Sequence, residues 1–398
     1  MNPRRGGVLR PRLSPPPQTI ATGAVVAIVG FFSSFPIVLQ GISAMGANAA
    51  QATSALMVAA LSMGLTGVVL AVWFRSPITV AWSTPGAALL AISAAPQGGY
   101  SDALGAFVIA GALCVVAGLW RPIGRLAAAI PTSLAQAMLA GVLLPICLNP
   151  ARALPDLPQF VIPIFLAWLI AGRINRLAAV PAAVLVTAVL VATLDGVPQI
   201  SETGLFSAPV WTTPSFSLAS GISIAIPLFI VSMATQNIPG IAIMRSHGFS
   251  PPAGPLFATV GIASILTAPF GAFSTCLAAI TSAMCANEDS HPDPALRYWS
   301  AVVAGTGYCV LGLFAGLVTA FAALAPPMVV ASLAGLALMS VLAGSAQAAL
   351  ADPKDREAAI VTLLITASGI TFYDLGAPVW GLLIGGMVYL IQRWARGS

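Results

Sequence analysis

Long apolar stretches, separated by short clusters of glycine, proline and charged residues, follow one another along almost the whole chain. They lack the every-second-residue alternation of a transmembrane barrel, as VVLAVWF and VPAAVLVTAVLVATL illustrate, so we expect helices. A spanning helix needs about 20 apolar residues. The pattern predicts fourteen spans, of which the third and tenth are short, at 19–42, 50–74, 78–94, 101–119, 130–148, 159–172, 178–195, 217–238, 252–269, 272–286, 295–323, 327–349, 357–373 and 376–392.

Composition supports an integral membrane protein and leaves no room for a sizeable soluble domain. The 398 residues are 58% hydrophobic and only 7% charged, whereas soluble proteins carry about 25% charged residues. The basic, proline-rich residues 1–18 are expected to form a short cytosolic arm. The apolar stretch from about residue 20 to residue 42 is longer than the about 7–15 apolar residues of a signal peptide, so we expect an uncleaved first span.

Positive charges predict the orientation of the chain. With a cytoplasmic N-terminus and alternating spans, fifteen of the sixteen Lys and Arg residues fall on the cytoplasmic side, and only Arg152 falls outside. Cytoplasmic loops of membrane proteins carry such an excess, and one miscounted span would scramble it. We therefore expect both termini in the cytoplasm. The outer loops carry acids instead, namely Asp102, Asp156, Asp195, Glu202 and Asp374.

The fourteen spans divide into two sets of seven, a first repeat at 19–195 and a second at 217–392, joined by a linker at 196–216. Because seven is odd, the second set enters from the opposite side, which predicts the inverted repeat common in secondary transporters. Pro36 in FSSFPIVLQGISAMG aligns with Pro239 in TQNIPGIAIMRSHG. This alignment sets Ser33 and Ser34 against Gln236 and Asn237.

The short third and tenth spans share a polar start, AWSTPGAALLAIS at 81–93 and AFSTCLAAITSAM at 272–284. We expect AWST and AFST to be extended, strand-like pieces that each lead into a half-helix. Extended backbone at membrane depth is tolerated only when it is buried in protein or lines a cavity. Two such pieces can pair and direct both half-helix N-termini at one point, which predicts an anion site without a buried Lys or Arg.

Four segments, AWSTPGAALL, SMATQNIPGIA, PFGAFSTCLAAITSAMC and ITASG, resemble the benzoate/proton symporter (BenE) family, and the resemblance covers essentially the whole chain. It implies the uracil-transporter fold, with a core domain of spans 1–4 and 8–11 and a gate domain of spans 5–7 and 12–14. Substrate is then expected between spans three and ten, beside spans one and eight. It also implies import of benzoate or a similar aromatic carboxylate with a proton across the cytoplasmic (inner) membrane, and homodimers as a common assembly.

The resemblance also implies a set of substrate-binding residues. Hydroxyl and amide groups can hydrogen-bond a carboxylate, and two adjacent amides at membrane depth are costly unless partnered or functional. The aromatic candidates for contact with a ring are Phe31, Phe32, Phe35, Trp82 and Phe273. The polar candidates are Ser83, Thr84, Ser274 and Thr275 at the expected half-helix starts, Gln236 and Asn237 on span eight, and Ser33, Ser34 and Gln40 on span one.

Proton coupling is expected from the resemblance alone. Nucleobase transporters of the wider group carry carboxylates on spans eight and ten, where this chain has amides and hydroxyls. The nearest titratable side chains, Asp102, Asp374 and His247, fall near predicted span ends. A uniporter, an anion channel, and a transporter of another small organic anion or of a nucleobase therefore stay open as alternatives.

An enzyme is not expected. The two histidines, His247 and His291, fall in predicted loops, and neither an HExxH nor a GxSxG pattern is present. The five cysteines have no CxxC spacing, so packing is the better interpretation than a metal site or disulfides. We accordingly expect no metal, no cofactor and no nucleic-acid partner.

Overall fold

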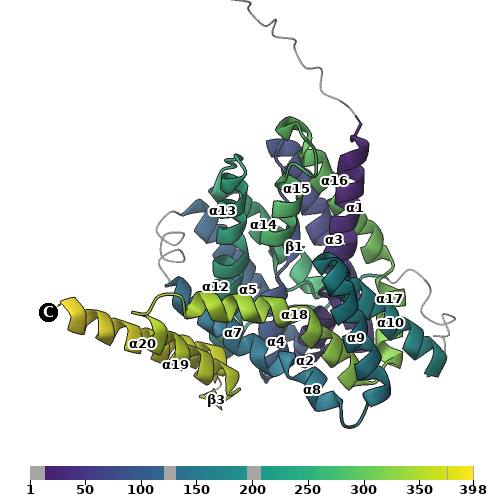
Figure 1. Ribbon diagram of the computed structural model, residues 1–398. Helices are drawn as coiled ribbons and strands as arrows, with labels where there is room; N and C mark the ends of the chain where they lie inside the picture. The colour runs from purple at the N-terminus through teal and green to yellow at the C-terminus, as the bar shows by residue number, and fades with distance from the viewer. Residues whose placement is uncertain (1–13, 121–130, 195–207, 374, 398) are drawn as a thin grey trace, which may run out of the picture.

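A computed structural model describes residues 14–120, 131–194, 208–373 and 375–397, and helices make up most of it (Figure 1). The first half contains α1 (Pro17–Phe32), α2 (Phe35–Ala44), α3 (Ala49–Phe74), β1 (Val80–Trp82), α4 (Thr84–Ile92), α5 (Tyr100–Leu119), α7 (Thr132–Cys147), α8 (Asn149–Ala153), α9 (Pro158–Ile174), η1 (Arg176–Ala178) and α10 (Ala179–Leu194). Most of the predicted N-terminal arm lies outside the described residues.

The second half begins with a helix that is interrupted by two π-helical turns. Its elements are α11 (Leu218–Ser220), η2 (Gly221–Ala225), α12 (Ile226–Ser232), η3 (Met233–Asn237), α13 (Ile238–Ser246), α14 (Ala253–Thr267), η4 (Ala268–Phe270), β2 (Thr275–Leu277), α15 (Ala279–Ala286), η5 (Pro294–Leu296), α16 (Tyr298–Leu313), α17 (Ala315–Leu324), α18 (Pro327–Ala349), α19 (Arg356–Ala367), β3 (Thr371–Phe372), β4 (Leu375–Gly376) and α20 (Ala377–Gly397).

Within the described residues, eight helices are long and apolar enough to cross a membrane, or nine if α16 and α17 form one span bent by 56°. The chain is therefore a helical polytopic membrane protein. Several predicted spans agree closely with observed helices, for example 50–74 with α3 and 327–349 with α18. The five cysteines are free thiols, and four of them are buried.

Two predicted span ends are wrong, and one predicted span is broken within its length. Span eight was predicted to end at residue 238, before Pro239, but the helix continues to Ser246. Pro239 lies in the first turn of α13, where the missing backbone N–H of a proline is tolerated. Span eleven is broken at Phe314. Span thirteen ends at Ala367, because Gly369 has a φ of 68° that stops the helix before the β3–β4 hairpin.

Two strands from distant parts of the chain pair at the centre of the molecule. Strands β1 and β2 are antiparallel, with Ala81 opposite Cys276. The pairing extends one residue beyond each strand, because Ser83 N–H donates to Ser274 O at 3.0 Å and Ala278 N–H donates to Thr79 O at 3.0 Å. Strand β1 overlaps the predicted piece AWST, whereas β2 shares only Thr275 with the predicted piece AFST; each strand is followed by a short helix, α4 or α15.

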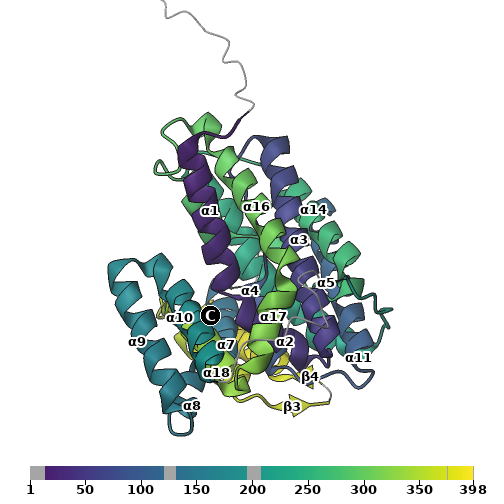
Figure 2. The same ribbon diagram turned by 90° about the vertical axis from the view of Figure 1, so that its right-hand side faces the viewer.

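Close helix contacts surround this strand pair. Helices α3 and α16 lie side by side, as do α5 and α14 (Figure 2). Glycines allow the approach, because a Cβ on Gly64 would lie 2.5 Å from Gly305 O and a Cβ on Gly111 would lie 3.0 Å from Gly261 O. These contacts pack two spans of the first half against two spans of the second around β1 and β2.

A second group of helices consists of α7, α9, α10, α18, α19 and α20. Helix α7 packs against α18 and α19, α9 packs against α10, and α19 packs against α20. Helices α19 and α20 both contact α7, and the C-terminal end of α20 extends away from the other helices (Figure 1). The two helix groups meet where α4 contacts α7 and where α2 contacts α18, so the strand pair and its half-helices lie beside this interface.

Candidate functional site

The half-helix α4 starts directly after β1, and Ser83 caps it. The Ser83 hydroxyl accepts a hydrogen bond from Gly86 N–H at 3.1 Å, and Ser83 is completely buried. Serine is a favoured N-cap because its side chain satisfies one of the free N–H groups of the first turn. Thr84, by contrast, is half-buried and its hydroxyl bonds no described residue. Ser83 therefore supports the helix, while Thr84 is available to a ligand.

A chain of hydroxyl groups connects α4 to the second half of the protein. Ser232, the last residue of α12, donates to Ser83 Oγ at 2.7 Å, and its oxygen lies 3.4 Å from Ser274 Oγ. Ser232 was not among the residues predicted from the sequence. The signal was present, because Ser232 precedes Gln236 by four residues in the motif SMATQNIPGIA, which places both on similar faces one helical turn apart.

The prediction that Ser274 and Thr275 lie at a half-helix start is wrong. Thr275 opens strand β2, Ser274 precedes it, and α15 starts only at Ala279. Helix cannot start earlier, because Thr275 N–H donates to Ser264 Oγ at 2.9 Å and the pairing with β1 keeps 275–277 extended. The Thr275 hydroxyl bonds Ser62 at 2.7 Å. The structural counterpart of Ser83 is Ala278, which has no side chain able to cap α15.

Asn237 is a framework residue. Its Oδ1 accepts the N–H of Leu277 at 2.8 Å, on the strand edge away from β1, and its Nδ2 donates to Met233 Sδ at 3.2 Å. Only 1% of Asn237 is exposed. The neighbouring Gln236 is half-buried, and its amide bonds no described residue. The two adjacent amides thus differ, and Gln236 alone is free for a ligand.

The first span is broken at Ser33 and Ser34, the residues that the proline alignment set against Gln236 and Asn237. Helix α1 ends at Phe32 and α2 starts at Phe35, with Ser33 and Ser34 between them. The Ser34 hydroxyl donates to Gly30 O at 3.0 Å and accepts the indole N–H of Trp82 at 2.8 Å. Ser33 is half-buried without a described side-chain partner. Ser34 therefore ties this break to β1, and Ser33 is left free.

Most of the aromatic side chains predicted to contact a ligand ring are instead buried and packed against other side chains. Phe31, Trp82 and Phe273 are at most 2% exposed. The Phe31 ring lies 5.4 Å from that of Trp82, and Phe273 lies 6.2 Å from Phe107. Phe35 is also buried, and only Phe32 is half-buried. Of the five candidates, Phe32 is the one with appreciable accessible surface.

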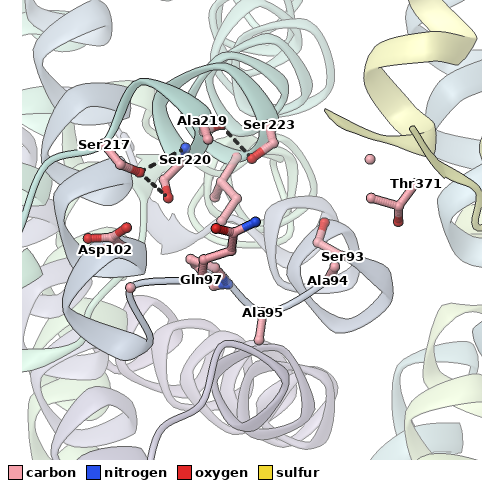
Figure 3. A pocket seen from close by; sticks show the side chains of 14 residues that line it. Ser93, Ala94, Ala95, Gln97, Asp102, Ser217, Ala219, Ser220, Ser223 and Thr371 are labelled. Carbon is pink, nitrogen blue, oxygen red and sulfur yellow. Dashed lines mark hydrogen bonds between the residues drawn. The ribbon is translucent and has the colours of Figure 1, made fainter. Parts of the chain in front are cut away.

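Asp102 lines a cavity of about 330 Å³ away from the strand pair (Figure 3). Its Oδ1 accepts a hydrogen bond from the Ser215 hydroxyl. Around the cavity, Ser217 donates to Ser220 Oγ at 2.8 Å, and Thr371 lines the wall opposite. Ser215 N–H also donates to Ser101 O at 3.0 Å. Asp102 thus attaches the segment before α11 to the start of α5.

A second proton candidate, His247, does not join the residues around β1 and β2. His247 follows the last residue of α13, and its Nδ1 lies 2.9 Å from the carbonyl oxygen of Ile243 in the same helix. Asp374 lies outside the described residues. Gln40 was predicted to bind substrate together with the residues around β1 and β2. It instead lines a larger cavity of about 950 Å³ between α2, α3, α17 and α18.

Comparison with known proteins identifies the family. The family described as "Benzoate membrane transport protein" matches residues 14–391. The chain belongs to this family. Within it, the chain is 39% identical over 379 residues to "Inner membrane protein YdcO" of Escherichia coli, covering 94% of this chain and 96% of that protein. It is 31% identical over 341 residues to "Benzoate membrane transport protein" of Acinetobacter baylyi, covering 85% and 86%.

Solved structures share the fold of this benzoate transport family member. The transmembrane domain of the cyanobacterial bicarbonate transporter BicA matches with a TM-score of 0.59 at 19% identity, covering 89% of this chain and 97% of that domain. The murine anion transporter Slc26a9 matches with a TM-score of 0.62 at 12% identity, covering 96% and 70%. The family is one of membrane transporters, so the protein is not an enzyme.

For this benzoate transport family member, we expect Asp102→Leu to lower stability by about 1 kcal/mol, because the Ser215 hydroxyl loses its acceptor. Asp102→Asn keeps an acceptor oxygen and should be milder. Thermal unfolding of the purified variants in detergent measures both, with Ser215→Ala expected to resemble Asp102→Leu. Equal losses for the leucine and asparagine variants would show that the carboxylate charge matters rather than the hydrogen bond.

Proposed function

We propose that this protein is a secondary transporter that imports benzoate or a similar aromatic carboxylate together with a proton. Its family and the name of the Acinetobacter baylyi relative support the substrate class. The observation that carries the proposal is the junction of the strand pair with its half-helices. Three polar side chains that have no hydrogen-bond partner among the described residues, Thr84, Gln236 and Ser33, come from three segments that adjoin β1 and β2.

The start of α15 supports an anion site. Ala278 provides no cap, so the first N–H groups of α15 have no side-chain acceptor among the described residues. Such a helix N-terminus carries a partial positive charge and binds anions. Ile280, in the same turn, is 66% exposed, so this turn is accessible. We infer that the substrate carboxylate binds there and beside Gln236, and that its ring contacts Phe32.

We also propose the fourteen-span, seven-plus-seven inverted repeat for this chain. Helix contacts occur in pairs that such a repeat relates: α3 with α16 and α14 with α5, α2 with α4 and α13 with α15, and α9 with α10 and α19 with α20. The two half-helix units fit the same relation, because Ser83 and Ala278 both precede a half-helix. In this proposal spans 1–4 and 8–11 form a core domain, and spans 5–7 and 12–14 form a gate domain.

The proposed setting is the cytoplasmic (inner) membrane with both termini in the cytoplasm. The positive charges along the sequence support this orientation, and the Escherichia coli relative is named an inner membrane protein. A homodimer is proposed from the family resemblance. Movement of the core domain relative to the gate domain would expose the site alternately to the two sides.

Uptake into liposomes tests the proposed function. We expect saturable uptake of labelled benzoate, increased by an inward-acid pH gradient and competed by other aryl carboxylates. Gln236→Ala should reduce uptake about 10–100-fold, since a hydrogen bond to a charged group contributes about 1.5–3 kcal/mol. Gln159→Ala, at an exposed glutamine of α9, is the matched control. Empty liposomes correct for passive entry of benzoic acid. Uptake by folded protein that never exceeds empty liposomes would exclude benzoate.

A further inference from the structure

The half-helix α15 has one buried face and one open face. Ile280 is 66% exposed, and Ala283 and Met284 are half-buried. These three positions recur at helical spacing, so they lie on the same side of the helix. The open face thus begins with Ile280, in the first turn. The residues of the buried face are Ala279, Thr281, Ser282, Cys285 and Ala286.

Hydrogen bonds at both ends hold α15 in this rotation. Near its start, the hydroxyl of Thr281 shares a hydrogen bond of 2.7 Å with Thr79, the residue before β1. At its end, Arg297 Nη1 donates to Ala286 O at 2.8 Å. These bonds attach the buried face to the strand pair and to the residue before α16. The direction of the Ile280 side chain is therefore fixed by the fold.

The open space beside Ile280 suits water or a ligand rather than lipid. Ala278 leaves the first N–H groups of α15 without a side-chain acceptor among the described residues, and turning unpaired N–H groups toward hydrocarbon is costly. The second residue of α4, Pro85, is buried, and α4 packs against α7. The first turn of α15 is thus the more open of the two half-helix starts.

Helices α1 and α16 run in the same direction, and α15 runs against both. A Cβ on Gly23 would lie 2.6 Å from Ser300 O, and a Cβ on Gly307 would lie 2.6 Å from the Cβ of Ala27. Contacts therefore advance together along α1 and α16. The chain reverses between α15 and α16, since Ser300 Oγ donates to Cys285 O at 3.3 Å. A step toward the start of α15 is thus a step toward the end of α1.

Phe32, at the end of α1, lies at a similar depth to Ile280. Helices α1 and α15 are in contact, and Val26 packs in one cluster with Cys285. At about 1.5 Å per residue, Phe32 is about 9 Å along α1 from Val26, and Ile280 is about 7.5 Å along α15 from Cys285. The Phe32 ring is held edge-on against Phe31, with the centroids 5.3 Å apart. Both side chains can therefore contact the ring of one ligand.

We propose that Ile280 determines the width of the aromatic acid that the protein accepts. The inference rests on the proposed function and names the residue that limits its substrate. The Cα–Cβ bonds of a helix tilt toward its N-terminus, so the Ile280 side chain leans toward a carboxylate bound at the start of α15. The attached ring lies between Ile280 and Phe32. A ring system wider than that of benzoate meets the branched side chain of Ile280.

Competition between a narrow and a wide aryl carboxylate tests the role of Ile280. Unlabelled benzoate and naphthoate are each used to inhibit uptake of labelled benzoate into liposomes, and the ratio of their half-inhibitory concentrations measures selectivity. This ratio does not depend on the amount of folded protein. We expect Ile280→Ala to shift it toward naphthoate about tenfold or more, since one methylene in an apolar pocket changes discrimination about 10–200-fold. Ile280→Phe should shift it toward benzoate.

Leu266→Ala on α14 is the matched control, because Leu266 is also 66% exposed, and it should leave the ratio unchanged. Ile280→Val removes a single methylene and should shift the ratio less, which keeps the test possible if Ile280→Ala does not fold. A ratio that is unchanged in the Ile280 variants, or that shifts equally in Leu266→Ala, would overturn the inference alone. Absence of benzoate uptake by the unmodified protein would instead refute the proposed function, and the inference with it.

Discussion

Replacing Asn237 with leucine is expected to destabilise the protein by about 1–3 kcal/mol, whereas Gln236→Leu should leave stability nearly unchanged and remove benzoate uptake. Asn237 Oδ1 accepts the buried N–H of Leu277, and a leucine of similar size would leave that donor unpaired. Gln236 has no described partner to lose. Thermal unfolding in detergent, read beside liposome uptake, separates the two effects at adjacent positions.

Comparing the stabilities of the Gln236 and Asn237 variants distinguishes loss of substrate binding from loss of folding. If Gln236→Leu unfolded the protein, its loss of uptake would say nothing about the substrate. If Asn237→Leu were as stable as the unmodified protein, strand β2 would not depend on this amide. Asn237→Asp keeps an acceptor oxygen and serves as the conservative comparison, expected to retain more stability than the leucine variant at a pH where the carboxyl group is neutral.

Gly64→Ala is expected to destabilise the protein by about 1–3 kcal/mol, and Gly67→Ala, one turn later on α3, should be neutral or slightly stabilising. A Cβ on Gly64 would lie 2.5 Å from Gly305 O and from Cys309 Sγ, so α3 and α16 would have to separate. A Cβ on Gly67 would meet Val80 N at 3.5 Å, an ordinary contact, and alanine favours helix over glycine.

Melting temperatures of the two alanine variants, measured in the same detergent, check this prediction. Gly305→Ala is the reciprocal test, because a Cβ there would lie 2.7 Å from Gly64 O. A Gly64→Ala variant as stable as Gly67→Ala would mean that α3 and α16 can separate without loss. That outcome would contradict close backbone packing as the basis of the contact.

Much of the fold follows from features that act locally along the chain. Uninterrupted apolar stretches predicted α3 and α18 closely, because a spanning helix needs a minimum apolar length. The strand pair was predicted because AWST and AFST are too polar and too short for full spans. The sequence alignment of Pro36 with Pro239 also matched the break between α1 and α2 to the π-helical turn η3.

The extent of the second strand could not be predicted, because distant contacts determine it. The match of AWST to AFST makes Ser274 the sequence equivalent of Ser83, whereas the residue that precedes α15, as Ser83 precedes α4, is Ala278, four residues later. Ser264 and Ser62 hold Thr275 in an extended conformation, and both lie on other helices. Likewise, only the fold shows that Ser232 meets Ser83, that Asn237 supports β2, and that Ser215 pairs with Asp102.

The pairing of β1 with β2 has a consequence for the synthesis of the protein. Residues 80–82 leave the ribosome almost 200 residues before their partners at 275–277. During that interval the first half contains an extended segment whose backbone groups lack their final partners, and exposing such groups to lipid is costly. Insertion of the first half must therefore leave this segment hydrated or held by the insertion machinery. A chain truncated in the 196–216 linker should accordingly be a preferred target of membrane quality-control proteases.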